Sequence, residues 1–183
     1  MMKRILLFVL CAMIVLGLSS CFRPAAAEDA EKNEQTLRIG AREIALDIDP
    51  VVPIVADYLV NVGAAELLFK VDAKGVPRPV LAESAEQLSP TEWSVKLKDG
   101  VTFWSGKTVD ADAVIASLER SRALDIKAQP FISMMTFEKT GDLEIRVTTS
   151  LSDIDVPLNL SYFQLVIHNA DMDFNSVDTM DLT

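Results

Sequence analysis

An apolar run near the start divides the chain into a targeting segment and a part that can fold. Lys3 and Arg4 give the first residues a positive charge, and residues 5–17 are almost entirely apolar. This run is shorter than the roughly 20 residues that span a bilayer. A positive start, a short apolar segment and small residues are typical of a secretory signal peptide. We therefore predict that residues 1–20 are a signal peptide and that the folded part lies after them.

Two cleavage sites compete behind the apolar run. Leu18-Ser19-Ser20-Cys21 resembles the bacterial lipobox, whereas Ala25-Ala26-Ala27 has the small-x-small pattern of ordinary signal peptidase sites. Position favours the lipobox, because Cys21 directly follows the apolar run. A Cys21 that carries acyl chains would anchor the protein to a membrane, since each buried methylene contributes about 0.8 kcal/mol. Residues 21–35 then form a flexible polar tether.

The composition permits an ordinary folded domain and excludes several kinds of site. Of the 183 residues, 50% are hydrophobic and 24% charged, which fits one globular domain with a core. The two cysteines are Cys11 and Cys21, so the later chain has no disulfide, no cysteine zinc site and no thiol nucleophile. His168 is the single histidine, and a lone histidine is usually a surface or packing residue. We expect no metal site and no cofactor.

The charge argues against nucleic acid as a partner. The formal net charge is −10. Because Lys3 and Arg4 lie in residues 1–20, the chain after these residues has a still more negative net charge. Such a surface repels phosphate and offers no basic stripe for counterion release. Membrane attachment therefore has to come from a lipid on Cys21 or from a spanning segment.

Hydrophobic periodicity predicts strands and helices in alternation. A helix is expected at residues 54–69, although Gly63 weakens it, and another at residues 111–122 with Asp110 as its N-cap. The mixture indicates an α/β or α+β fold. A shorter helix is expected at residues 153–160, and strands at residues 36–41, 93–97, 101–103, 137–149 (a hairpin that turns at 140–142) and 162–167.

The sequence carries no motif of an enzyme. Asp110 with Asp112, or Asp153 with Asp155, could be proposed as acid/base pairs. Solvated acidic residues at the starts of helices explain both pairs without catalysis. We expect that the protein is not an enzyme.

Several short motifs follow one another in the order of a known family. Ile48-Asp49-Pro50 is similar to a Leu-Asp-Pro opening, and Glu66-Leu67-Leu68 to a Glu-x-Leu motif. Residues 75–84 resemble a Gly-x-x-x-Pro-x-Leu-Ala-Glu-Ser stretch. The longest match extends from Trp93 to Arg120 and contains Leu97 to Phe103, Gly106, Asp110 to Val114 and Ser117 to Arg120. This order resembles the extracytoplasmic solute-binding family that serves ABC importers of peptides, nickel and opines.

Three positions depart from the family pattern. Ala113 replaces an aspartate, Lys98 replaces an arginine, and Ala85 stands where an aromatic residue is usual. The first and third positions look structural, so these departures concern stability more than the type of ligand.

The resemblance implies a periplasmic-binding-protein-like fold of two lobes that close on a solute in the cleft between them. Family members are much longer, so only part of the N-terminal lobe is expected here. Residues 36–170 would form this partial solute-binding domain, and residues 171–183 a truncated, disordered tail.

The implied function is capture of a small solute, first of all a peptide, outside the cytoplasm. The protein would be exported to the periplasmic or cell-surface side and would hand its ligand to the membrane subunits of an ABC importer. Two alternatives stay open. The solute could be nickel or a metal chelate, or the chain could be a lipoprotein remnant of a split gene that binds nothing.

The groups that face the cleft are expected near loops that follow strands, and six residues are candidates for contact with the ligand. Aromatic rings offer flat apolar area to a variable ligand, and amide side chains can hydrogen-bond a peptide backbone. The alternative for Phe131 and Tyr162 is that they pack between elements. The candidates are Tyr58, Asn61, Trp104, Phe131, Tyr162 and Gln164.

Overall fold

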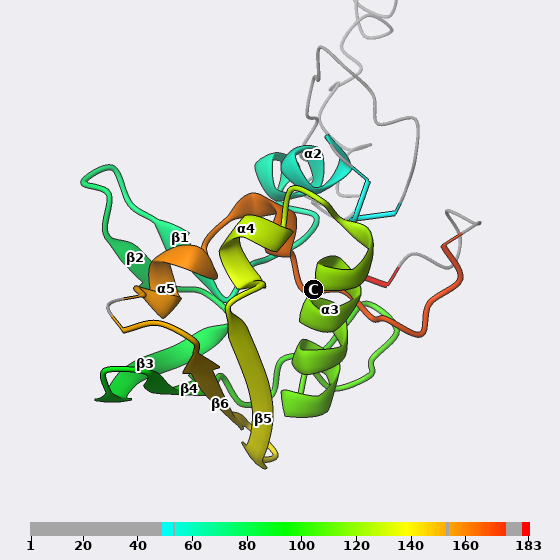
Figure 1. Ribbon diagram of the computed structural model, residues 1–183. Helices are drawn as coiled ribbons and strands as arrows, with labels where there is room; N and C mark the ends of the chain where they lie inside the picture. The colour runs from blue at the N-terminus through cyan, green and yellow to red at the C-terminus, as the bar shows by residue number, and fades with distance from the viewer. Residues whose placement is uncertain (1–48, 53, 153, 175–180) are drawn as a thin grey trace, which may run out of the picture. The chain divides into compact units, whose positions relative to one another are not determined.

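A computed structural model of the chain describes residues 49–52, 54–152, 154–174 and 181–183 (Figure 1). The expected signal peptide, the lipidation at Cys21, the tether and the strand at residues 36–41 lie outside the described residues. Among the described helices, none has the length and the hydropathy that a bilayer span requires.

The centre of the fold is an antiparallel sheet of four strands in the order β3-β4-β6-β5 (Figure 1). Alternate side chains of β4 and β6 are buried, which gives the sheet an inner face. A separate hairpin of β1 (Phe69–Val71) and β2 (Pro77–Pro79) turns through Gly75, whose φ of 80° suits glycine. The strands of the sheet are β3 (Ala82–Ser89), β4 (Glu92–Leu97), β5 (Met135–Gly141) and β6 (Glu144–Thr149).

Helix α3 (Ala111–Leu124) packs against β5 and has the start that the sequence predicts. The Ala113 backbone N–H donates to Asp110 Oδ1 at 2.9 Å. This bond satisfies one of the backbone donors that a helix leaves free at its N-terminus. The helix, its N-cap, the β4 strand and the β5–β6 hairpin are confirmed, and so is the mixed α/β class.

The cap leads to a first prediction. Asp110→Ala should lower the free energy of unfolding by about 1 kcal/mol, because the Ala113 donor then loses its acceptor. Urea denaturation measures the change. Asp110→Asn is the matched control, since its amide oxygen can still accept this bond. Equal losses in the two variants would show that the cap contributes nothing.

The expected helix at residues 54–69 is wrong in its second half. Helix α2 covers only Val55–Val62, and Gly63 closes it with a φ of 73° in the left-handed region. Glycine adopts that conformation without steric cost and commonly ends helices. Residues 64–68 then connect α2 to β1 without forming a helix or a strand. The helix at residues 153–160 exists as the short α5 (Val156–Asn159), and α4 (Gln129–Ile132) was not predicted.

Two expected strands are wrong as well. Residues 101–103 make only an isolated bridge, Thr102 with Thr108, and the partners of β4 in the sheet are β3 and β6. In place of a strand at residues 162–167 there is a 3₁₀ helix, η2 (Phe163–Leu165). Residues 164–168 are all buried, and a continuously buried run has no period that distinguishes a strand from another conformation.

The described core consists of two hydrophobic clusters. The larger one joins the sheet to α3, α4, α5 and η2. The smaller one joins α2 to Ala65, Leu67, Val166 and Leu182.

Leu182 brings the end of the chain into the smaller cluster. It pairs with His168 in an antiparallel bridge and accepts a hydrogen bond from the Trp104 N–H at 2.9 Å. Of the expected tail, residues 171–174 and 181–183 are described, whereas residues 175–180 lie outside the described residues. No feature of the sequence indicated the contact with His168.

Candidate functional site

Phe131 and Tyr162 are in contact. Phe131 lies on α4 and Tyr162 directly before η2, and their rings stack with centroids 3.7 Å apart and planes inclined by 17°. The Tyr162 ring also meets Phe163 at 4.6 Å. Both residues of the stack are half-buried and pack on the larger cluster. The stack therefore joins α4 to η2, and a ligand-binding role for it stays a prediction.

The other four candidates lie in different surroundings. Trp104 is 60% exposed in the loop after Phe103. Asn61 is exposed on α2 and donates its amide to Asp57, while Tyr58 on the same helix is half-buried. Gln164 is 1% exposed, and its side-chain nitrogen and oxygen have no hydrogen-bond partner among the described residues. Their roles as ligand contacts also stay predictions.

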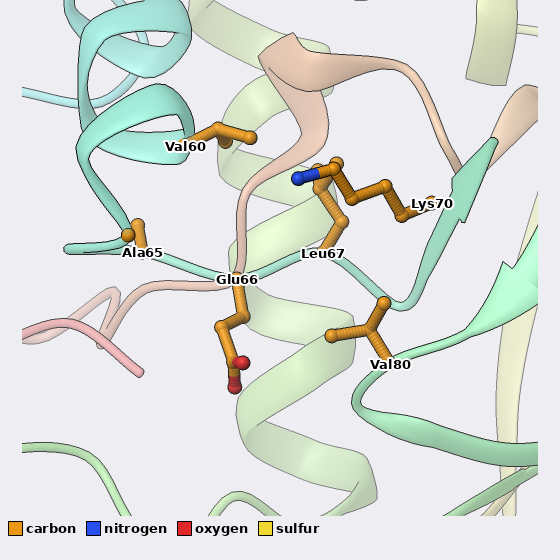
Figure 2. A pocket seen from close by; sticks show the side chains of 7 residues that line it. Val60, Ala65, Glu66, Leu67, Lys70 and Val80 are labelled. Carbon is orange, nitrogen blue, oxygen red and sulfur yellow. The ribbon is translucent and has the colours of Figure 1, made fainter. Parts of the chain in front are cut away.

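A small pocket of about 120 Å³ lies between the end of α2, residues 63–67 and the β1–β2 hairpin (Figure 2). Val60 and Leu67 point toward each other, and the Lys70 side chain extends over Leu67 toward Val60 (Figure 2). Glu66 points away from them (Figure 2). The lining consists of Val60, Gly63, Ala65, Glu66, Leu67, Lys70 and Val80. Sequence reasoning missed this pocket, because its residues come from three elements and share no local pattern.

The chemistry of this pocket is that of binding. Its walls are mainly aliphatic, and Lys70 supplies one ammonium group, so it can accept a small apolar group that carries a negative charge nearby. Its lining offers no pairing of a nucleophile with a base of the kind that covalent catalysis uses. Within the described parts of the chain, no group of three or more His, Cys, Asp and Glu is placed to hold a metal ion.

A second polar site surrounds Arg120 on α3. Arg120 Nη1 and Nη2 donate to the two carboxylate oxygens of Asp49 at 2.7 Å each. The side chains are only 15% and 18% exposed. Burial disfavours the ionised form of Asp49, but hydrogen bonds from Arg120 and from the Val51 N–H, together with the Arg120 charge, outweigh it and hold the pKa of Asp49 below its usual value.

Asp49 and Arg120 belong to two of the family-like motifs. Asp49 lies in Ile48-Asp49-Pro50 and Arg120 in Ser117-Leu118-Glu119-Arg120. Both motifs are visible in the sequence, but nothing in it relates one to the other. The ion pair joins them across 71 positions of the chain.

His168 lies in the interior beside Arg120. It is 0% exposed, and its Nδ1 lies 3.1 Å from both Ser117 Oγ and the Val166 carbonyl oxygen. Burial lowers the pKa of His168 to about 4, and although the hydrogen bond with Val166 opposes this, the nearby Arg120 charge adds to it. His168 is therefore neutral at pH 7.

Comparison with known proteins identifies a family and a relative that match parts of this chain. The family described as bacterial extracellular solute-binding proteins, family 5 Middle, matches residues 76–180. The nickel-binding protein NikA of Staphylococcus aureus is 37% identical over 71 residues, which are 39% of this chain and 14% of that protein.

Two solved structures share the fold. NikA from S. aureus in complex with Ni(L-His)2 has a TM-score of 0.64 at 25% identity, over 74% of this chain and 28% of that chain. The nickel ABC transporter protein from Bacillus halodurans has a TM-score of 0.60 at 29% identity, over 73% of this chain and 27% of that chain. The present chain therefore spans less than a third of the length of the relatives it matches. The periplasmic-binding-protein-like fold is confirmed for the part that is described.

Proposed function

Because the chain belongs to the bacterial extracellular solute-binding proteins of family 5, we propose that it acts in capturing a small solute outside the cytoplasm for an ABC importer. The match over residues 76–180 is the observation that carries this proposal. The partners are then the solute and the membrane subunits of the importer. Neither the described site nor the sequence motifs call for an enzymatic step.

For the solute, we place a nickel chelate before a peptide. This reverses the order of the sequence analysis, because NikA of S. aureus binds nickel and has been found with Ni(L-His)2. His168, the only histidine in the sequence, is buried and hydrogen-bonded to Ser117, so it is not accessible to a metal ion. A complex that carries its own histidine ligands needs no such residue from the protein.

A peptide is the second candidate solute. Trp104 and Asn61 are exposed side chains of the kinds that stack on a ligand and hydrogen-bond a peptide backbone. A lipoprotein remnant that binds nothing is the third reading.

Uptake in the source organism tests these readings. Deletion of the reading frame should lower the uptake of radioactive nickel supplied with histidine, a plasmid copy should restore it, and tripeptide uptake should stay unchanged. Loss of tripeptide uptake with normal nickel uptake would favour the peptide reading. If neither uptake changes, the remnant reading is the better one.

The attachment to a membrane gives a further prediction. We propose that Cys21 is lipidated on an exported protein, because Leu18-Ser19-Ser20-Cys21 closes the apolar run. Cys21→Ser should abolish the incorporation of labelled fatty acid and release the protein from the membrane fraction. Cys11→Ser is the matched control, since Cys11 lies inside the apolar run and should have no effect. Unchanged labelling in Cys21→Ser would favour cleavage after Ala27.

A further inference from the structure

Arg120 makes two different contacts at once, with segments that lie far apart in the sequence. Its edge donates to both carboxylate oxygens of Asp49 at 2.7 Å, and its Cζ lies 3.5 Å from the centroid of the Phe174 ring. A guanidinium group is planar, donating hydrogen bonds along its edge and stacking through its face. The two contacts therefore use different parts of one group and can form together.

His168 completes the surface on which the Phe174 ring lies. Its Nε2 is 3.5 Å from Arg120 Nη1, and its ring meets Phe174 edge to face with centroids 5.9 Å apart. The Ser117 hydroxyl group is 3.1 Å from Nδ1 on the other side of the imidazole. Phe174 thus packs on the Arg120 cation, which is fixed by Asp49, and on the neutral His168 ring, which is fixed by Ser117.

We propose that Arg120 is a two-sided clamp, in which pairing with Asp49 orients the guanidinium plane and thereby docks residues 169–174 against α3. A free arginine side chain has many rotamers and a hydrated face, and a bidentate partner removes that freedom before the ring stacks. The position of the segment that follows His168 then depends on the segment that precedes α2.

Two of the other attachments of residues 169–174 are weak or lie away from the Phe174 ring. Lys107 pairs with Asp171 at 2.9 Å, but the two side chains are 46% and 82% exposed, and such surface pairs contribute little. Asn169 binds Asp181 at 2.7 Å, which fixes the start of the segment and not Phe174. Arg120 and His168 are thus the described groups on which the Phe174 ring packs.

Hydrogen exchange on the full chain tests the clamp. Asp49→Asn and Phe174→Leu should each raise the exchange rate of the Met172 amide about tenfold. Asp49→Asn removes a hydrogen bond of the charged pair, and Phe174→Leu removes the ring that stacks on Arg120. The double variant should exchange no faster than either single one, since the two contacts act as a unit. Amides of β4 and β6 should keep their rates, and Lys107→Ala should leave Met172 nearly unchanged.

Two results would overturn the clamp. One is a Met172 rate in Asp49→Asn equal to that of the unaltered chain, and the other is a double variant whose rate multiplies the two single effects. If Asp49→Asn does not fold, Phe174→Leu still decides, because coupling is reciprocal. The amides of Val51 and Val52, which bond to Asp49, must then exchange faster, and unchanged rates there refute the proposal.

Discussion

Replacement of Arg120 by alanine is expected to lower the free energy of unfolding by about 3 kcal/mol, more than any other single substitution considered for this chain. The reason is that Asp49, whose side chain is 18% exposed, would keep its charge and lose both hydrogen bonds from Arg120. Phe174 would also lose the guanidinium face on which it packs. Urea denaturation at neutral pH measures the change.

A surface ion pair provides the control for this substitution. Lys139 bonds to Asp112 at 2.7 Å, yet the Asp112 side chain is 70% exposed. Solvent screens such a pair, so Lys139→Ala should alter the stability far less. Replacement of both Arg120 and Asp49 by apolar residues should recover part of the loss, because no buried charge is then left unpaired. An Arg120→Ala loss no greater than that of Lys139→Ala would contradict this account of the cluster.

The second large effect is a fall in stability between neutral and mildly acidic pH. The pKa of His168 is about 4 in the folded chain, against an ordinary value of 6.5. Below about pH 6.5 the unfolded chain therefore binds a proton at His168 that the folded chain does not bind. The free energy of unfolding is unaffected by His168 above that pH and falls as the pH drops toward 4. At about pH 4.5 the loss should reach about 2.5 kcal/mol.

The assignment of this effect to one side chain is simple here, because the chain contains a single histidine. Asp49 and Asp181 have lowered pKa values, so their contributions are lost at lower pH than that of His168. His168→Asn, which offers an amide in place of Nδ1, should flatten the curve between about pH 6.5 and 4.5. The measurement is urea denaturation at several pH values on protein without a histidine tag. The same slope in the variant would exclude His168 as its cause.

Elements with a local signal were predictable from the sequence. Helix α3 follows a capping aspartate, Asp110, and β4 and β6 alternate buried and exposed residues. Strand β3, with the sequence AESAEQLS, has no β-branched or aromatic residue, and it pairs only because β4 offers it an edge. Its existence depends on tertiary context, which propensity does not contain.

The polar cluster could be predicted only in part. The motifs that contain Asp49 and Arg120 are visible in the sequence, but a salt bridge across 71 positions leaves no periodicity to read. The same is true of Leu182, which reaches His168 through an isolated bridge. Phe131 and Tyr162 were nominated for the chemistry of their rings. The stack between them joins α4 to the residue before η2, and no local sequence pattern predicts that contact.

The most direct test of the proposed function is a calorimetric titration of the protein expressed from the complete reading frame that contains these residues. Three ligands should be compared under the same conditions, namely nickel with two equivalents of L-histidine, L-histidine alone and a tripeptide. The account predicts a saturable isotherm with the nickel–histidine complex and none with the other two. A saturable isotherm with the tripeptide and no heat with the nickel–histidine complex would contradict it.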